Sequence, residues 1–150
     1  MVLQFACETA VKQGGMLVDT AAILEPAEAS GISQEDVYRT LEVSAEFGLI
    51  DVYAEETVSG KITAFAISPI TFAKYARETI PDYDSLLKDV KMAIKEGKTN
   101  SHDISSRLRK PHWIIVQILE LLKRDKLVDG ITNVGGDFVV TNVKRRLKRE

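Results

Sequence analysis

The chain has 150 residues, of which 45% are hydrophobic and 28% are charged, and its formal net charge is −2. This composition is typical of a folded protein with one medium core or two small ones, and it excludes a disordered chain. No apolar run reaches the roughly 18 residues that a membrane-spanning helix needs, and the N-terminal residues lack the order of a signal peptide, so we expect a soluble, cytoplasmic protein with no membrane contact.

The net charge hides a division along the chain. Residues 1–80 contain 5 Lys and Arg against 12 Asp and Glu, a balance of −7, whereas residues 81–150 contain 15 against 10, a balance of +5. Opposite charge in the two halves predicts different partners. We therefore expect an acidic domain over 1–80 and a basic domain over 81–150.

The acidic domain begins with three predicted helices. Apolar residues three and four apart in VLQFACETAVKQ predict a helix over 2–13. The single cysteine, Cys7, lies on its apolar face, which favours a small core residue over a nucleophile. Gly31 fits the exit of a second, short helix. Ser33 opens an S-x-x-D capping box, which predicts a third helix over about 33–47.

Two β-prone runs and one more helix complete this domain. LIDVY at 49–53 and KITAFAIS at 61–68 read as strands, and Ser59-Gly60 between them supplies a hairpin turn. The segment SPITFAKYARETIPDY then predicts a helix over about 69–79, which ends before a proline. We expect this helix to link the two domains.

The basic domain repeats the same order of elements. Its first helix shows an apolar stripe of leucine, valine and isoleucine and stops at a glycine. Pro111 fits the first position of the third helix, because its fixed φ is helical and it has no N–H to leave unpaired. The predicted elements are helices over 84–97, 103–108 and 111–126, a hairpin over 127–141 that turns at Gly135-Gly136, and a basic tail, KRRLKRE, over 144–150.

An internal repeat relates the two domains. Residues 26–50 align with residues 104–128 without a gap at an offset of 78 residues. Few residues are identical between the two segments; Leu41 and Leu119 are one such pair. Apolar residues nevertheless recur at equivalent positions along the whole segment. The alignment predicts two related units fused in tandem.

The segment EASGISQEDVYRTLEVSAEFGLI resembles the helix-turn-helix core of winged-helix proteins, as found in prokaryotic and archaeal transcription regulators. The second unit is similar through DISSRL, IVQILELL and LVDGITNVGGDFVVT, and it departs at the turn, where Arg109-Lys110-Pro111 replaces Gly-Ile-Ser. The resemblance implies a mainly α, α+β fold of two tandem winged helix-turn-helix domains, each with a three-helix core and a β-hairpin wing. The motif specifies a fold better than a role.

In DNA-binding proteins of this kind, the third helix enters the major groove while the wing and flanking groups meet phosphates. In the first unit this comparison places Glu35 and Asp36 at the groove, where phosphates would repel them, so we expect dimerisation or protein contacts there. The second unit is the expected reader of double-stranded DNA. Its candidate contacts are Arg107, Arg109, Lys110, His112, Trp113, Gln117, Lys144, Arg145 and Arg146.

Apolar residues cover more than one face of the predicted helix over 111–126. The third helix of an ordinary winged-helix domain keeps one side exposed to solvent. The apolar residues Ile114, Ile118 and Leu121 therefore predict a contact with the other unit or with a second chain. Trp113 fits three roles: an interface anchor, a base-stacking residue or a core residue.

The sequence offers little for catalysis. Its two histidines, His102 and His112, lack the spacing of the common metal motifs, and no nucleophile or phosphate-binding glycine motif is present. We therefore expect no enzyme, cofactor or metal site. Two functions stay open: a DNA-binding regulator, or a protein-protein adaptor similar to the tandem winged-helix subunits of chromosome-condensation or membrane-sorting complexes.

Overall fold

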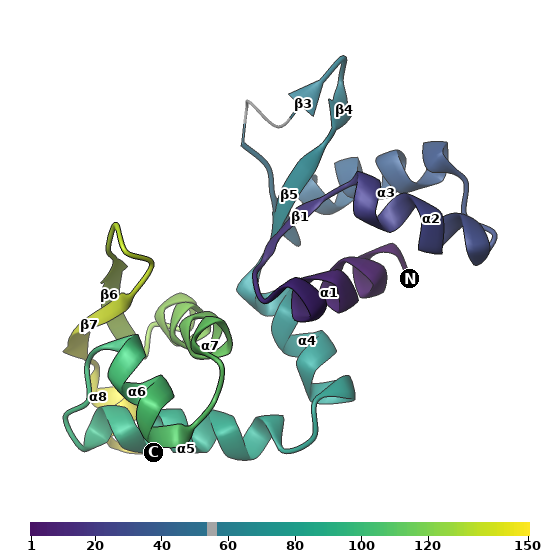
Figure 1. Ribbon diagram of the computed structural model, residues 1–150. Helices are drawn as coiled ribbons and strands as arrows, with labels where there is room; N and C mark the ends of the chain where they lie inside the picture. Colours follow the sequence, from purple (N-terminus) through teal and green to yellow (C-terminus); the bar gives the residue numbers. More distant parts are fainter. Residues whose placement is uncertain (54–56) are drawn as a thin grey trace. The chain divides into compact units, whose positions relative to one another are not determined.

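The computed structural model describes residues 1–53 and 57–150 and shows a mainly helical α+β chain (Figure 1). The chain divides into two compact units, Met1–Tyr75 and Ala76–Glu150, called unit 1 and unit 2 below. The division falls inside helix α4, Pro69–Thr79, a helix that the sequence predicts over the same residues. Among the described residues, no helix combines the length and apolar character that crossing a bilayer requires.

Unit 1 contains the three predicted helices, α1 (Val2–Gln13), α2 (Ala21–Ala29) and α3 (Gln34–Glu46). The Ser33 hydroxyl accepts a hydrogen bond from the Asp36 N–H at 3.2 Å, which confirms the predicted cap of α3. This cap satisfies one of the donors that a helix leaves unpaired at its start.

Cys7 lies on the buried side of α1 and is 1% exposed. Burial, and to a smaller extent the neighbouring charge of Glu8, raises the pKa of its thiol to about 11. The thiolate is the reactive form of cysteine, so at neutral pH this side chain is an inert member of the core, as the sequence predicts.

In the described part of unit 1, five short strands accompany these helices: β1 (Leu17–Asp19), β2 (Ile50–Asp51), β3 (Thr57–Val58), β4 (Lys61–Ile62) and β5 (Ala64–Ile67). Three of them form an antiparallel sheet in the order β1-β5-β2, and β3 pairs with β4 in a separate hairpin. The predicted strand over 61–68 is thus divided into β4 and β5. The sequence did not predict β1, whose Val18 pairs with Phe65, both fully buried.

Unit 2 has helices α5 (Tyr83–Lys95), α6 (Ser101–Leu108) and α7 (His112–Arg124), followed by the hairpin of β6 (Val128–Thr132) and β7 (Phe138–Val143). The segment before α6 joins this hairpin, because Asn100 bridges to Val139 and the Val140 N–H donates to the Thr99 carbonyl at 2.7 Å. Pro111 is the N-cap of α7 rather than its first helical residue: its ψ of 132° is extended.

The C-terminal segment differs from the predicted basic tail. Residues Arg145–Lys148 form a short helix, α8, and its Leu147 is fully buried. One apolar side chain therefore anchors the tail to unit 2, and the cations around it are held on an ordered element. The sequence analysis predicts a basic tail over these residues but does not predict helix α8.

The internal repeat holds at the level of single residues. Helices α3 and α7 cover 34–46 and 112–124, an offset of 78 residues at both ends. Leu41 and Leu119 occupy equivalent positions and are both fully buried. After each helix the chain takes a left-handed conformation at the equivalent residue, with φ of 71° at Gly48 and 59° at Lys126.

Lys126 is the strained member of this last pair. A residue with a Cβ in the left-handed region costs roughly 1 kcal/mol or more, whereas glycine adopts it without a steric penalty. We expect Lys126→Gly to raise the free energy of unfolding of unit 2 by about 1 kcal/mol in urea denaturation. The reciprocal variant, Gly48→Ala, should lower that of unit 1. Equal stability of Lys126→Gly and the parent would show that the left-handed residue carries no strain.

Candidate nucleic-acid interface

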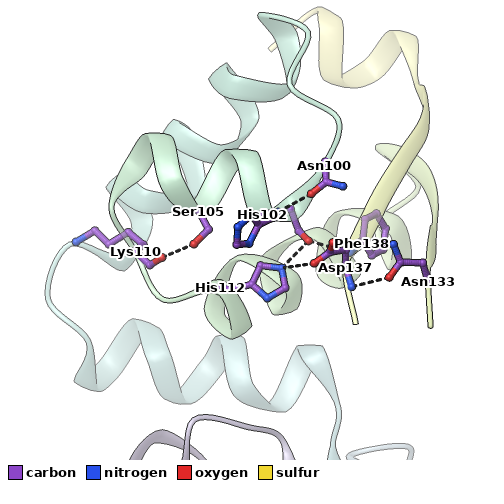
Figure 2. Close-up of polar contacts among 9 residues, drawn as sticks. Asn100, His102, Ser105, Lys110, His112, Asn133, Asp137 and Phe138 are labelled. Carbon is purple, nitrogen blue, oxygen red and sulfur yellow. Dashed lines mark hydrogen bonds and ion pairs between the residues drawn. The ribbon is translucent and has the colours of Figure 1, made fainter. Parts of the chain in front are cut away.

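The turn between α6 and α7 presents the first group of predicted DNA contacts. Arg109 ends α6 in the left-handed conformation, with φ of 54°. The Ser105 hydroxyl donates to the Lys110 carbonyl at 2.6 Å, and the Lys110 N–H donates back to the Ser105 carbonyl at 3.2 Å (Figure 2). The backbone of the turn is therefore fixed, while the side chains of Arg109 and Lys110 are exposed.

Arg107 belongs to the same group but already has a partner. Its guanidinium pairs with the Glu96 carboxylate, and both side chains are substantially exposed. Exposed ion pairs contribute little to stability, because water screens them and two long side chains must be ordered. Arg107 can therefore exchange Glu96 for a phosphate at small cost. Arg107, Arg109 and Lys110 are called the turn cluster below.

The second group, Lys144, Arg145 and Arg146, is called the tail cluster. The Lys144 N–H donates to the Leu127 carbonyl at 3.0 Å, and the Arg146 guanidinium donates to the carbonyl of Asp125 at 3.4 Å. Asp125 is the C-cap of α7, so the tail cluster lies beside the C-terminal end of that helix. The turn cluster lies at its N-terminal end.

Lys144 also pairs with Asp129 of β6 at 2.8 Å. Its hydrogen bond is the main cause that lowers the pKa of the Asp129 carboxyl, with smaller contributions from Asn142 and Lys123. The side chains of Lys144 and Asp129 are 41% and 53% exposed, so this pair resembles Arg107–Glu96 in being readily opened.

The remaining predicted contacts are less exposed than the sequence suggests. His112 Nε2 lies 2.7 Å from the Ser101 hydroxyl and 3.3 Å from an Asp137 oxygen. Trp113 and Gln117 are half-buried. The Gln117 side-chain oxygen is buried and has no hydrogen-bond partner in the part of the chain that the structure describes. These three side chains are therefore partly withdrawn from solvent. They do not form an exposed set of residues on α7 that could contact DNA bases directly.

The apolar residues of α7 are largely covered. Ile118 is fully buried and Leu121 is 6% exposed, while Ile114 is half-buried. The equivalent positions in unit 1 hold Thr40, Val43 and Asp36, which are half-buried or exposed. The apolar excess that the sequence indicates is thus specific to unit 2. The role of these residues as a contact between units or between chains stays a prediction.

Further cations were missed by the sequence analysis. A groove on unit 2 is lined by Lys95 of α5, Asn142 of β7 and Lys148 of α8, and by Thr99 of the segment between α5 and α6. A neighbouring hollow includes Lys88 and Lys91. Lysines at 88, 91 and 95 recur three and four residues apart and share one face of a helix, so their spacing could have indicated this surface.

The equivalent surface of unit 1 is acidic. At the start of α3, Glu35 and Asp36 both pair with Arg39, at 2.9 and 3.7 Å, and all three side chains are exposed. The single cation is therefore already neutralised by two carboxylates. A phosphate would meet net negative charge here. The expectation that unit 1 does not read DNA stays a prediction.

No protein-family model, curated protein or solved structure matches the chain. The function of the molecule is therefore inferred from its own residues.

Proposed function

We propose that the chain is a tandem winged-helix protein. In unit 1 the order is helix, strand, two helices and four short strands, β2 to β5, with the sheet order β1-β5-β2. Unit 2 repeats it, with the bridge of Asn100 to Val139 in place of a full first strand and the hairpin β6–β7 in place of the four short strands. A three-helix core with a hairpin after the third helix is the arrangement of winged helix-turn-helix domains. In this proposal α3 and α7 are the third helices, and the wings are the strands β2 to β5 in unit 1 and the hairpin β6–β7 in unit 2.

We further propose that unit 2 binds double-stranded DNA. The observation that carries this proposal is the position of the turn and tail clusters at opposite ends of α7. With 13 residues, α7 is about 20 Å long, whereas the major groove is about 12 Å wide. A helix of this length across the groove brings one cluster to the phosphates of each strand.

The left-handed residues of unit 2 support the same proposal. Unit 1 has Gly31 and Gly48 at the two positions with positive φ, and unit 2 has Arg109 and Lys126 at the equivalent places. Unit 2 therefore holds a cation at each end of α7 where glycine would be more stable. Backbone strain that is kept at a defined position suggests that the residue there has a function. Phosphate binding is a function that suits both cations.

Half-buried Trp113 and Gln117 favour binding to the DNA backbone over sequence reading. Backbone contacts carry little sequence information and depend steeply on salt. We expect the full chain to be retained on duplex DNA of arbitrary sequence at low salt and released as salt rises. With four to six contacts from the two clusters, log Kobs against log salt should have a slope of about −3.6 to −5.4. Retention that does not respond to salt, or no retention at low salt, would remove this function.

One observation favours the second candidate, a protein-protein adaptor. Unit 1 exposes Val43 and Phe47, one turn apart around the end of α3, and Phe47 is 75% exposed. Exposed apolar side chains beside acidic ones are typical of protein contact surfaces. If the chain has no affinity for DNA, both units would then serve protein partners. In the DNA-binding proposal, unit 1 alone provides this contact, as a homodimer or with another protein.

A further inference from the structure

Three potential metal ligands meet where α6, α7 and the β6–β7 hairpin come together. His102 is the second residue of α6, His112 is the first of α7, and Asp137 directly precedes β7. One ligand atom from each of them lies within 4.8 Å of the others. Figure 2 shows the two imidazole rings side by side, with a carboxylate oxygen of Asp137 facing His112. The ring centroids are 5.7 Å apart.

The arrangement is not that of a serine hydrolase. Ser101, His112 and Asp137 supply the three residue types of a catalytic triad, but the hydroxyl and the carboxylate both face the same nitrogen, Nε2, at 2.7 and 3.3 Å. In a triad the acid and the nucleophile occupy opposite ring nitrogens, because the imidazole must pass a proton between substrate and serine. Ser101 is also fully buried, which keeps substrates from its oxygen.

We propose that His102, His112 and Asp137 form a binding site for a divalent transition-metal ion, with Zn²⁺ as the best-suited ion. Two imidazoles and one carboxylate are ligands that Zn²⁺ accepts, with a fourth position left to water. Bond lengths to Zn²⁺ and the tetrahedral angle place neighbouring ligand atoms about 3.3 Å apart. His112 Nε2 and Asp137 Oδ1 already have this spacing, 3.3 Å. His102 is exposed, so rotation of its side chain can bring the third ligand into place.

Neighbouring side chains hold the backbone N–H groups of two of the ligands, His102 and Asp137. The Asn100 side chain accepts from the His102 N–H at 2.8 Å, and the Asn133 side chain accepts from the Asp137 N–H at 3.0 Å (Figure 2). These two hydrogen bonds hold the start of α6 and the residue before β7 in place. The Ser101 hydroxyl accepts from the Phe138 N–H at 2.8 Å and lies 2.7 Å from His112 Nε2, the nitrogen that would bind the ion, so coordination would displace this hydroxyl contact.

The bound ion would join three elements that are far apart in sequence. It would tie the starts of both helices of the proposed helix-turn-helix to the base of the wing turn. An ion that binds only the folded chain stabilises it by mass action. The inference goes beyond the proposed DNA binding, because the site needs no nucleic acid and is tested without it.

The test uses the full chain without an affinity tag that contains histidine. In isothermal titration with ZnCl₂ alone, we expect one ion per chain. His102→Ala and Asp137→Asn should each weaken binding at least about 10–100-fold, the loss that even outer-shell changes cause. The matched control is Asp103→Asn, an exposed carboxylate next to His102 that is outside the cluster, and it should bind like the parent.

Two further readouts protect this test from loss of folding. Co²⁺ bound in a four-coordinate site gives intense visible absorption, which the parent and Asp103→Asn should show and Asp137→Asn should lack. Zn²⁺ should raise the unfolding midpoint of unit 2 in the parent and leave that of Asp137→Asn unchanged. The proposal is overturned if the folded parent binds no Zn²⁺ at millimolar concentration, or if Asp103→Asn loses as much affinity as His102→Ala.

Discussion

Leu119→Ala is expected to lower the free energy of unfolding of unit 2 by about 2–5 kcal/mol, the usual range for a buried leucine. The side chain is fully buried on α7, so its removal loses burial energy and leaves a cavity. Leu41→Ala is the matched variant in unit 1, because Leu41 is the equivalent residue of α3 and is also fully buried. A domain of about 75 residues has little stability to spare.

The single tryptophan makes the two effects separable. Trp113 is in unit 2, so its fluorescence in urea follows that unit, while circular dichroism follows the helices of both. We expect Leu119→Ala to shift the fluorescence transition and Leu41→Ala to leave it in place while shifting part of the dichroism transition. Equal shifts of the fluorescence transition in the two variants would show that the chain unfolds as one cooperative body.

Removing two charges from the turn cluster is expected to weaken duplex DNA binding by at least about a hundredfold at low salt, because each charged hydrogen bond contributes about 1.5–3 kcal/mol. The variant is Arg109→Gly with Lys110→Gln. Glycine suits the left-handed backbone at Arg109, where φ is 54°, so the double variant should fold at least as well as the parent. The slope of log Kobs against log salt should become shallower by about 1.8.

The control removes the same charge from the other unit. Lys12→Gln with Lys74→Gln changes two exposed lysines of unit 1, and the affinity of this variant for duplex DNA should equal that of the parent. If the control loses as much affinity as the turn variant, the net charge of the chain determines its affinity for DNA, and unit 2 has no specific DNA-binding face. If neither variant loses affinity, the cations of the turn do not meet phosphates.

The helices could be predicted from the sequence because their causes are local. Ser33 caps α3 by accepting a hydrogen bond from the N–H of Asp36, three residues later. Gly31 adopts a positive φ because the turn before α3 requires it. The internal repeat predicts α7 from α3, and α7 begins and ends 78 residues after α3. Periodicity and capping are properties of a few adjacent residues, so no knowledge of the rest of the chain is needed.

The missed elements depend on partners far away in the chain. Strand β1 has three residues, too few for a recognisable alternation, and exists because β5 offers its backbone. Helix α8 is stabilised by the burial of Leu147 in the core of unit 2. The cluster of His102, His112 and Asp137 spans 35 positions of sequence. A search for short metal motifs therefore misses ligands that only the packing of α6, α7 and the hairpin brings together.

Mapping duplex DNA onto the isotope-labelled full chain by NMR tests the central claim, that unit 2 binds DNA through the two ends of α7. On addition of DNA at low salt, backbone amide signals of residues 107–110, 112 and 144–146 should move, and the signals of α3 in unit 1 should stay in place. Signals of α3 that move as far as those of the turn and tail clusters would contradict the claim, as would a spectrum that DNA leaves unchanged.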